Sequence, residues 1–532
     1  MTLASTPSQQ SLSAALVDFT AALGADRVLT AQDDLREFRD PFQFETWDEN
    51  AASAVVMPEN VEEVQEVVRI ANRHGVPIWT LSQGRNNGYG GPAPRVQGSV
   101  IVSLRNMNRV LEIDEECAFA VVEPGVRWFD LYEAITAGKH RLMLSIADVG
   151  WGSVIGNTLD NGITYMPYGV DMAMQCGMEV VLADGSLMRT GMGAMPGNRS
   201  WNVYKRGLGP TVDQLFMQSN FGIVTKMGVW LMPFPEVYMP IWVRVWRDED
   251  LPAVVDTLRM LMLDDTIRMV PQVMNTILLG SIMTRRERWH QDEGPIPDGV
   301  IDAMARELEI GRWIMRAALY GDEAVVDHRF AKIKRAFERI EGADVWGTKH
   351  APEEIPSLAH PAERVQGGVP SLDINAMTAW YGGEEGGHIG FSPIAPLTGR
   401  DAVVLRDLMR PMIERAGLDY IAALLPVNAR SFAHITMVIF DTKNEAQVRS
   451  AYEVSSALVR EAAKLGYGEY RAHLRFMDLA TDQFSWGDHA YRRFCETLKD
   501  ALDPNGILSP GRHGIWPSSM RDTATRADAK GS

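Results

Sequence analysis

A ten-residue segment rich in glycine and asparagine is the first candidate for chemistry in this sequence. The segment SQGRNNGYGG (82–91) follows the apolar run PIWTL (77–81) and contains four glycines and two asparagines. Successive backbone N–H groups of such a loop can form a concave anion site, because glycine adopts positive φ and lets a pyrophosphate approach closely. An ordinary glycine-rich turn has the same composition. No GxGxxG opens a helix and no GxxxxGK[ST] occurs, so neither a Rossmann fingerprint nor a P-loop is predicted.

A second glycine-rich loop, GWGSVIGN (150–157), is preceded by Asp148 in the apolar run LMLSIADVG. A carboxylate in apolar surroundings serves either as a cap for the following turn or as a catalytic acid or base. The residues alone leave both interpretations open.

Two further positions carry polar groups suited to chemistry. His388 stands in GGHIGFSP at the start of a predicted strand, where a histidine is either a core residue or a functional one. Tyr470 and Arg471 place a phenol O–H beside guanidinium donors, which together can hold an anionic oxygen. The alternative is a tyrosine packed by its ring and an arginine facing solvent. No HExxH and no GxSxG occurs, so a metal site is not predicted and a serine hydrolase is disfavoured.

The elements that must position these groups alternate between helix and strand over the first 235 residues, which favours α/β architecture. Asn60 caps a predicted helix with a valine-rich face, and Gly75 ends it. Further patterns in this part predict strands at 77–81, 99–104 and 119–125, a helix at 128–138 and a hairpin at 178–190.

From about Glu236 the elements lengthen and predict an α+β domain with an antiparallel sheet. We predict an N-terminal part of one domain over 1–236, an inserted cap domain over 237–466 and a return to the first domain over 467–532. The segment 350–370, rich in Pro, Glu and Gly, is predicted to be a surface excursion. The remaining predictions for this part are strands at 238–246, 388–394, 420–426 and 432–440 and helices at 250–263, 324–340, 400–416, 445–465 and 490–501.

The overall composition excludes several classes of protein. The 69 acidic and 52 basic residues give a net charge of −17, so nucleic acid is not expected as a partner. Three separated cysteines, Cys117, Cys176 and Cys495, form no disulfide framework and no CxxC motif. No signal peptide and no apolar run of about 20 residues occurs, which predicts a soluble, cytoplasmic protein without a membrane partner.

Eight motifs, read together and in order, resemble the vanillyl-alcohol oxidase family of FAD-linked oxidoreductases, and most closely its bacterial members that act on 4-hydroxyphenyl compounds such as eugenol. The resemblance covers nearly the whole chain. The motifs are GRNNGYGG, DVGWGSVIGN, PYG, GMEVVLADGSLMRTGMGAMPG, QSNFGIVTKMG, GGHIGFSP, GYGEYRAH and DPNGILSPGRHGIW.

The resemblance implies a two-subdomain FAD-binding fold with an inserted substrate cap, in a homodimer or higher homo-oligomer. Tyr89, Tyr470 and Arg471 match the family's phenolate-binding residues, Asp148 matches its acid/base near flavin N5, and His388 matches the histidine that bonds covalently to the flavin 8α-methyl. The remaining cofactor-binding residues that it implies are Ser82, Gln83, Gly84, Arg85, Asn86, Asn87, Gly88, Gly150, Gly152, Ser153, Gly156, Asn157, Gly222, Ile223, Val224 and Arg512.

The activity implied is oxidation of para-substituted phenols (4-alkylphenols, 4-allylphenols or 4-hydroxybenzylic alcohols) through a p-quinone methide. Hydride leaves the benzylic carbon for the flavin, and molecular oxygen is reduced to hydrogen peroxide. The alternative is a dehydrogenase of the 4-cresol type, which passes electrons to a cytochrome or another acceptor. The sequence departs from the family pattern at Val170-Asp171, at Ser145-Ile146-Ala147 before the acid/base, and at Ala423.

Overall fold

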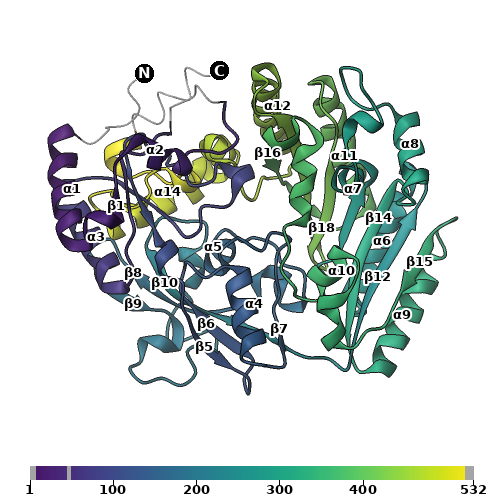
Figure 1. Cartoon of the computed structure of the whole chain (residues 1–532), viewed down its shortest axis with the longest axis horizontal. Helices are drawn as coiled ribbons and strands as arrows, with labels where there is room; N and C mark the ends of the chain where they lie inside the picture. The colour runs from purple at the N-terminus through teal and green to yellow at the C-terminus, as the bar shows by residue number, and fades with distance from the viewer. Residues whose placement is uncertain (1–7, 45–49, 522–532) are drawn as a thin grey trace.

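The computed structural model describes residues 8–44 and 50–521, apart from the side chains at 170–172. The chain forms two lobes (Figure 1). One contains both ends of the described chain, with α1 (Gln9–Leu23) and α14 (Trp486–Leu502), and the other contains the middle of the chain. The mixture of helix and sheet confirms the predicted α/β (α+β) class.

The first sheet carries the glycine- and asparagine-rich loop at the end of one strand. Its four strands have the order β1-β2-β4-β3, and β2 and β3 run parallel to β4. The helix α3 (Val61–His74) begins and ends as predicted, because Asn60 accepts the Glu63 N–H and Gly75 adopts φ +61°. The strands are β1 (Val28–Leu29), β2 (Ala54–Val56), β3 (Ile78–Leu81) and β4 (Val100–Ser103).

The second sheet is antiparallel throughout and has the order β5-β6-β10-β8-β9. The helix α4 (Trp128–Ala137) follows β6, and the short helix α5 (Val154–Leu159) follows the second glycine-rich loop. The strands are β5 (Val110–Asp114), β6 (Phe119–Val122), β8 (Gln175–Val181), β9 (Leu187–Arg189) and β10 (Ile223–Trp230), and a separate small pair consists of β7 (Leu142–Met143) and β11 (Met232–Pro233).

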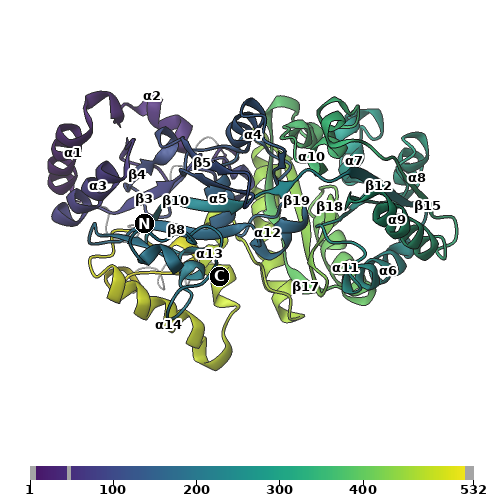
Figure 2. The same ribbon diagram turned by 90° about the horizontal axis from the view of Figure 1, so that it is seen from below.

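The cap is built on an eight-stranded sheet with the order β15-β12-β14-β13-β18-β19-β16, in which β17 pairs with β19. Helices α6, α9 and α11 lie on one side of this sheet and α7, α8 and α10 on the other (Figure 2). The strands are β12 (Val237–Val245), β13 (Gln272–Asn275), β14 (Trp313–Gly321), β15 (Asp344–Gly347), β16 (Gly386–Phe391), β17 (Ile394–Pro396), β18 (Ala422–Asn428) and β19 (Ser431–Asp441). The helices are α6 (Leu251–Leu263), α7 (Thr276–Met283), α8 (Asp298–Glu307), α9 (Glu323–Phe337), α10 (Pro361–Gln366), α11 (Gly399–Arg415) and α12 (Glu445–Lys464).

One expectation for the cap is wrong. The segment 350–370 is not a surface excursion throughout, because it contains α10, whose Val365 and Gln366 are buried. The Tyr238 and Tyr320 hydroxyls donate to the backbone oxygens of Glu363 and Gln366 at 2.6 and 2.7 Å. These contacts attach α10 to the cap sheet.

The C-terminal segment returns to the first sheet. After α13 (Met477–Asp482) and α14, Leu508 forms a parallel bridge with Ile78, and the Ser509 N–H donates to the Ile78 carbonyl at 2.7 Å. The C-terminal segment thus packs on the N-terminal part of the chain, in the order that we predicted. The domain boundaries at 236 and 466 stay a prediction. Among the described helices, none combines the length and the apolar character needed to cross a membrane.

A buried ion pair fastens the returning segment. Lys499 Nζ lies 2.8 Å from Asp503 Oδ2, and both side chains are fully buried. Lys499 also donates to the carbonyls of Asn220 and Leu508, at 3.0 and 2.6 Å. The pair therefore joins α14 to two loops beside the cavity described below.

We expect Lys499→Met to lower the free energy of unfolding by about 3–5 kcal/mol, because it leaves the Asp503 carboxylate buried without its cation. Denaturant unfolding of the holoenzyme measures the loss. Lys464→Met, at the exposed end of α12, is the control and should change stability by less than about 1 kcal/mol. Equal stability of the Lys499 variant and the wild type would contradict this account of the pair.

Candidate active site

A cavity of about 980 Å³ lies where the N-terminal sheets, the cap sheet and the C-terminal segment meet. With one exception, Gly150, the predicted site residues all line it. They are Ser82, Gln83, Gly84, Arg85, Asn86, Asn87, Gly88, Tyr89, Asp148, Gly152, Ser153, Gly156, Asn157, Gly222, Ile223, Val224, His388, Tyr470, Arg471 and Arg512.

The loop after β3 forms one wall of the cavity. Gly84 has φ +65°, a conformation that side chains disfavour, and the Gln83 amide donates to the Gly125 carbonyl at 2.6 Å. A Cβ on Gly156 would lie only 2.3 Å from Ser82 Oγ, so the two glycine-rich loops touch. A side chain at 156 would therefore force the Ser82 hydroxyl to move.

The second loop leads into α5, which Ser153 caps by accepting the Gly156 N–H at 2.9 Å. Gly150 lies behind the cavity wall: its N–H donates to the Ser371 carbonyl at 2.8 Å, and a Cβ there would lie 2.7 Å from the Phe129 ring. Gly150 is thus packed against Phe129, and its predicted contact with a cofactor stays a prediction.

Asp148 accepts three side-chain hydrogen bonds. Arg316 Nη2 lies 2.7 Å from its Oδ1, Gln272 Nε2 lies 3.3 Å from its Oδ2, and the Tyr165 hydroxyl also donates to Oδ2. These donors come from β14, from β13 and from the loop after α5. These donors hold the carboxylate at the cavity. Asp148 therefore binds side chains of the cap and does not cap the following turn.

The cation beside Asp148 was not identified from the sequence. Arg316 is 4% exposed, and its Nε has no hydrogen-bond partner among the described residues. Burial opposes its charge, but the Asp148 carboxylate and Tyr165 raise the pKa of Arg316 above its ordinary value. Arg316 therefore stays a guanidinium inside the cavity wall.

Tyr89, Tyr470 and Arg471 converge at another part of the cavity. The Arg471 guanidinium carbon lies 4.2 Å from the centre of the Tyr89 ring and 5.9 Å from that of Tyr470. Arg471 Nε is buried and has no hydrogen-bond partner in the described part of the chain. A permanently charged donor with a free N–H between two phenols is a site for an anionic oxygen.

The protonation states of this group follow from its surroundings. Burial raises the pKa of the Tyr470 phenol, and the Arg471 charge only partly offsets that rise, so Tyr470 keeps its proton and can donate it in a hydrogen bond. Burial opposes the charge of Arg471, whereas Tyr89, Tyr470 and Asp160 raise its pKa above the ordinary value.

His388, the third residue of β16, faces the first loop. A Cβ on Gly88 would lie 2.4 Å from His388 Nε2, and the Phe42 ring centre is 5.2 Å from the imidazole centre. The buried Nδ1 has no partner among the described residues. Burial, helped by the nearby His473, lowers the pKa of His388 to about 4, so its imidazole is neutral near pH 7 and keeps a lone pair available.

The C-terminal segment supplies Arg512, which donates to the Thr80 carbonyl at 3.2 Å and lies 3.5 Å from Asp160. Burial alone would raise the pKa of Asp160, but the hydrogen bond from His513 and the charge of Arg512 lower it well below its usual range. Asp160 therefore stays ionised and holds Arg512 beside the loop after β3.

Glu469, directly before Tyr470 and Arg471, is a further buried carboxyl, which we did not identify from the sequence. The Ser392 N–H donates to its two oxygens at 3.1 and 2.9 Å. Burial raises the pKa of Glu469 to about 8, although the Ser392 and Arg471 backbone N–H groups and the Arg471 charge act against that rise.

This pKa predicts a pH dependence of stability. The pKa of Glu469 in the folded protein, about 8, lies above its ordinary value of 4.5. The contribution of Glu469 to the free energy of unfolding is therefore fully present below pH 4.5 and is lost as the pH rises through 8. Glu469→Gln does not titrate, so we expect its melting temperature to fall less than that of the wild type between about pH 5 and pH 8. Calorimetry of both proteins checks this, with exposed Glu384→Gln as control. Parallel curves for wild type and Glu469→Gln would show that Glu469 does not titrate in this range.

The cavity suits FAD in three respects. Two touching glycine-rich loops offer backbone donors for a pyrophosphate, an unpartnered neutral imidazole lies against the first loop, and the volume is at the upper end of small-molecule sites, about 1,000 Å³. No group of three or more His, Cys, Asp or Glu side chains capable of holding a metal ion occurs among the described residues. The departure at Val170-Asp171 lies outside the side chains that the structure describes.

Two family models match the chain. The FAD binding domain matches residues 52–191, and the C-terminal domain of FAD linked oxidases matches residues 430–513. The chain is 37% identical over 503 residues to the 4-cresol dehydrogenase [hydroxylating] flavoprotein subunit of Pseudomonas putida, an alignment that covers 94% of this chain and 95% of that one. It is 28% identical to 1'-carboxy-chondrochloren decarboxylase of Chondromyces crocatus, over 96% of this chain and 99% of the relative.

Two solved structures are similar to this chain over nearly its whole length. The 4-ethylphenol oxidase from Gulosibacter chungangensis, in complex with isoeugenol, superposes with a TM-score of 0.93 at 37% identity, over 98% of this chain and 100% of that chain. The p-cresol methylhydroxylase with bound substrate superposes with a TM-score of 0.91 at 36% identity, over 97% and 99%. These matches confirm the predicted FAD-binding fold. The chain therefore belongs to the vanillyl-alcohol oxidase and p-cresol methylhydroxylase family, and it is a flavoprotein oxidoreductase.

Proposed function

We propose that this enzyme oxidises para-substituted phenols at the benzylic carbon. The observation that supports this most directly is Arg471, a buried guanidinium whose Nε is free and which lies 4.2 Å from the Tyr89 ring in the cavity wall. Relatives over nearly the whole length carry the names 4-cresol dehydrogenase and 4-ethylphenol oxidase. Both names describe phenols with a para alkyl group.

In this proposal the three residues bind the substrate as phenolate. A free phenol titrates near pH ~10, so keeping the anion at neutral pH requires a cation and hydrogen-bond donors. Arg471 supplies the charge, and the protonated Tyr470 supplies an O–H. Electron release from the phenolate oxygen then favours departure of a hydride from the para benzylic carbon and leaves a p-quinone methide.

Asp148 acts at the other end of the quinone methide. Held by Arg316, Gln272 and Tyr165, its carboxylate can take a proton from a water that adds to the methide, which gives a benzylic alcohol. Alternatively it takes a proton from the neighbouring carbon, which gives an alkene. Asp148 and Arg471 line the same cavity, and in this proposal one substrate contacts both.

FAD, when bound, supplies the hydride acceptor, with the Ser82–Tyr89 and Gly152–Asn157 loops and Arg512 holding it. His388 is proposed as its covalent attachment point, because a neutral imidazole keeps a lone pair that could form the C–N bond to the flavin 8α carbon. That carbon would lose a hydrogen in exchange, and the flavin itself would take up the two electrons.

Acid precipitation tests the attachment. We expect the yellow colour of the wild type to remain in the pellet and that of His388→Ala to move to the supernatant, since only the wild type has the bond. His434→Ala, which removes another buried histidine outside the cavity, is the control and should keep its colour in the pellet. A colourless wild-type pellet would refute a covalent bond between His388 and the flavin.

The electron acceptor is proposed to be molecular oxygen, with hydrogen peroxide as product. The 37% identity to the flavoprotein subunit of a dehydrogenase supports the alternative, a cytochrome or other acceptor. Turnover of 4-ethylphenol in air should consume oxygen and release one peroxide per product. Turnover that requires an added dye or cytochrome would favour the dehydrogenase instead. The homodimer and the cytoplasmic location remain predictions, and light scattering measures the former.

A further inference from the structure

The cavity continues beyond Asp148 along the inner face of the cap sheet. Strand register places Gln272, Arg316, Trp242 and Trp346 side by side on β13, β14, β12 and β15, and all four line the cavity. Neighbouring strands are about 4.8 Å apart, so this row extends over roughly 14 Å. Asp148 binds the first two residues of the row. The last two therefore lie beyond the reacting centre.

This extension has a mostly apolar lining, to which His360 and Glu363 add polar groups beside Trp242, and it reaches the edge of the sheet. Ile314 and Met274 continue the floor, while Leu278, Leu279 and Ile282 of α7 line the cavity beside them. At the edge strand β15, Trp346 is 40% exposed, whereas Trp242 is 5% exposed. The cavity thus leads from a buried indole to one at the surface.

The two indoles stack side by side and present their free edges and faces to the cavity. Their rings are nearly parallel, with an interplanar angle of 13° and centres 6.3 Å apart, and the His360 ring centre is 4.9 Å from that of Trp242. The Trp242 Nε1–H donates to Glu363 Oε1 at 2.9 Å, which fixes the orientation of the buried ring. Aromatic rings at such distances bind further aromatic groups through stacking and edge contacts.

We propose that this extension is a subsite for an aromatic ring carried at the end of the substrate's para side chain. The assignment rests on the proposed function, since it needs the phenolate at Arg471 and the benzylic carbon near Asp148. An ethyl side chain ends near the reacting centre, whereas Trp242 and Trp346 lie one and two strands beyond Arg316, roughly 5 and 10 Å away. The substrate class is therefore a 4-(arylalkyl)phenol.

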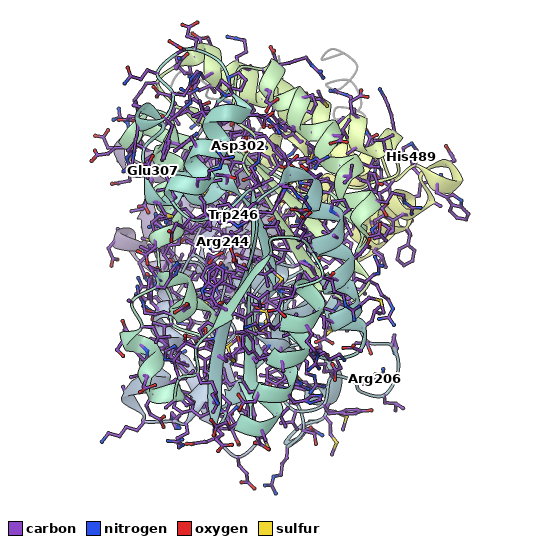
Figure 3. The ribbon with its side chains drawn as sticks, turned by 90° about the vertical axis from the view of Figure 1, so that its right-hand side faces the viewer. Arg206, Arg244, Trp246, Asp302, Glu307 and His489 are labelled. Atoms are coloured by element: carbon purple, nitrogen blue, oxygen red, sulfur yellow. The ribbon has the colours of Figure 1, made fainter. Side chains whose placement is uncertain are left out.

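The test compares kcat/KM for 4-(4-phenylbutyl)phenol and 4-butylphenol, which differ by the terminal ring. We expect the wild type to favour the phenylbutyl compound by about tenfold, and both Trp242→Ala and Trp346→Ala to lose most of that preference. Trp246→Ala is the control, because Trp246 follows the same strand but does not itself line the cavity; it packs on Arg244 (Figure 3), whose other ring contact is Trp346. Equal values for the two phenols in the wild type, or an unchanged preference in both variants, would overturn the subsite.

Binding separates this inference from the proposed function. The ethers 4-(4-phenylbutoxy)phenol and 4-butoxyphenol have oxygen in place of the benzylic carbon, so calorimetry measures their affinity without oxidation. Tighter binding of the phenylbutoxy compound that is lost in Trp242→Ala supports the subsite even if no phenol is oxidised. Oxidation of 4-butylphenol with equal affinity for both ethers would keep the proposed function and refute the subsite.

Discussion

Arg471→Gln is expected to lower kcat/KM for 4-ethylphenol by at least about 100-fold at neutral pH. Removing one member of a buried, hydrogen-bonded charge pair costs about 3 kcal/mol or more, which corresponds to this factor. The loss should shrink as the pH rises toward the phenol's own pKa of ~10, because solution then supplies the phenolate that Arg471 otherwise stabilises. Stopped-flow measurement of flavin reduction under argon, over a range of pH, checks both parts.

Arg430→Gln is the matched control for this variant. Arg430 is an exposed arginine at the turn between β18 and β19, outside the cavity lining. Its substitution therefore removes the same charge without changing the site. We expect it to react like the wild type. A wild-type rate in Arg471→Gln would show that Arg471 is structural and that the substrate does not bind as phenolate.

Asp148→Asn is expected to slow the decay of the quinone methide by about 10²- to 10⁴-fold and to change the ratio of benzylic alcohol to alkene, because an amide takes up no proton from water or carbon. Asparagine keeps the size of the side chain, and its one carbonyl oxygen can still accept from Arg316 while its amide donates to the Tyr165 hydroxyl oxygen. Single-turnover kinetics and chromatographic analysis of the products measure the two effects.

Binding of 4-bromophenol separates catalysis from folding in this variant, since this phenol lacks a benzylic hydrogen. Its affinity, followed by perturbation of the flavin spectrum, should stay within about threefold of the wild type if Asp148 acts on the quinone methide and not on binding. Asp184→Asn, in the exposed turn between β8 and β9, controls for the loss of one carboxylate. An unchanged rate and product ratio in Asp148→Asn would refute its role.

The local parts of the fold and site could be predicted from the sequence. Asn60 and Gly75 end their helix through short-range hydrogen bonds and positive φ, which a few neighbouring residues determine. The loop at Ser82–Tyr89 and the pair Tyr470-Arg471 are contiguous in sequence, so their chemistry is visible without knowledge of the fold. The resemblance to a known family then assigned these segments to one site.

The partners of Asp148 could not be predicted in this way. Gln272 and Arg316 lie 124 and 168 residues from it in sequence and meet it only through the register of β13 and β14. Both strands were missed, because β13 is only four residues long and β14 is buried along most of its length without alternation. Gly150 lies against Phe129 while its two neighbours line the cavity, a difference between adjacent residues that the sequence does not reveal.

In the proposed reaction, the substrate loses hydride as a phenolate that Arg471 and Tyr470 hold. The most direct test mixes the oxidised holoenzyme under argon with 4-ethylphenol or with its methyl ether, 4-ethylanisole, and follows the visible flavin spectrum. We predict rapid bleaching by the phenol and none by the ether, because the ether cannot form the anion. Bleaching at equal rates by both compounds would contradict the account.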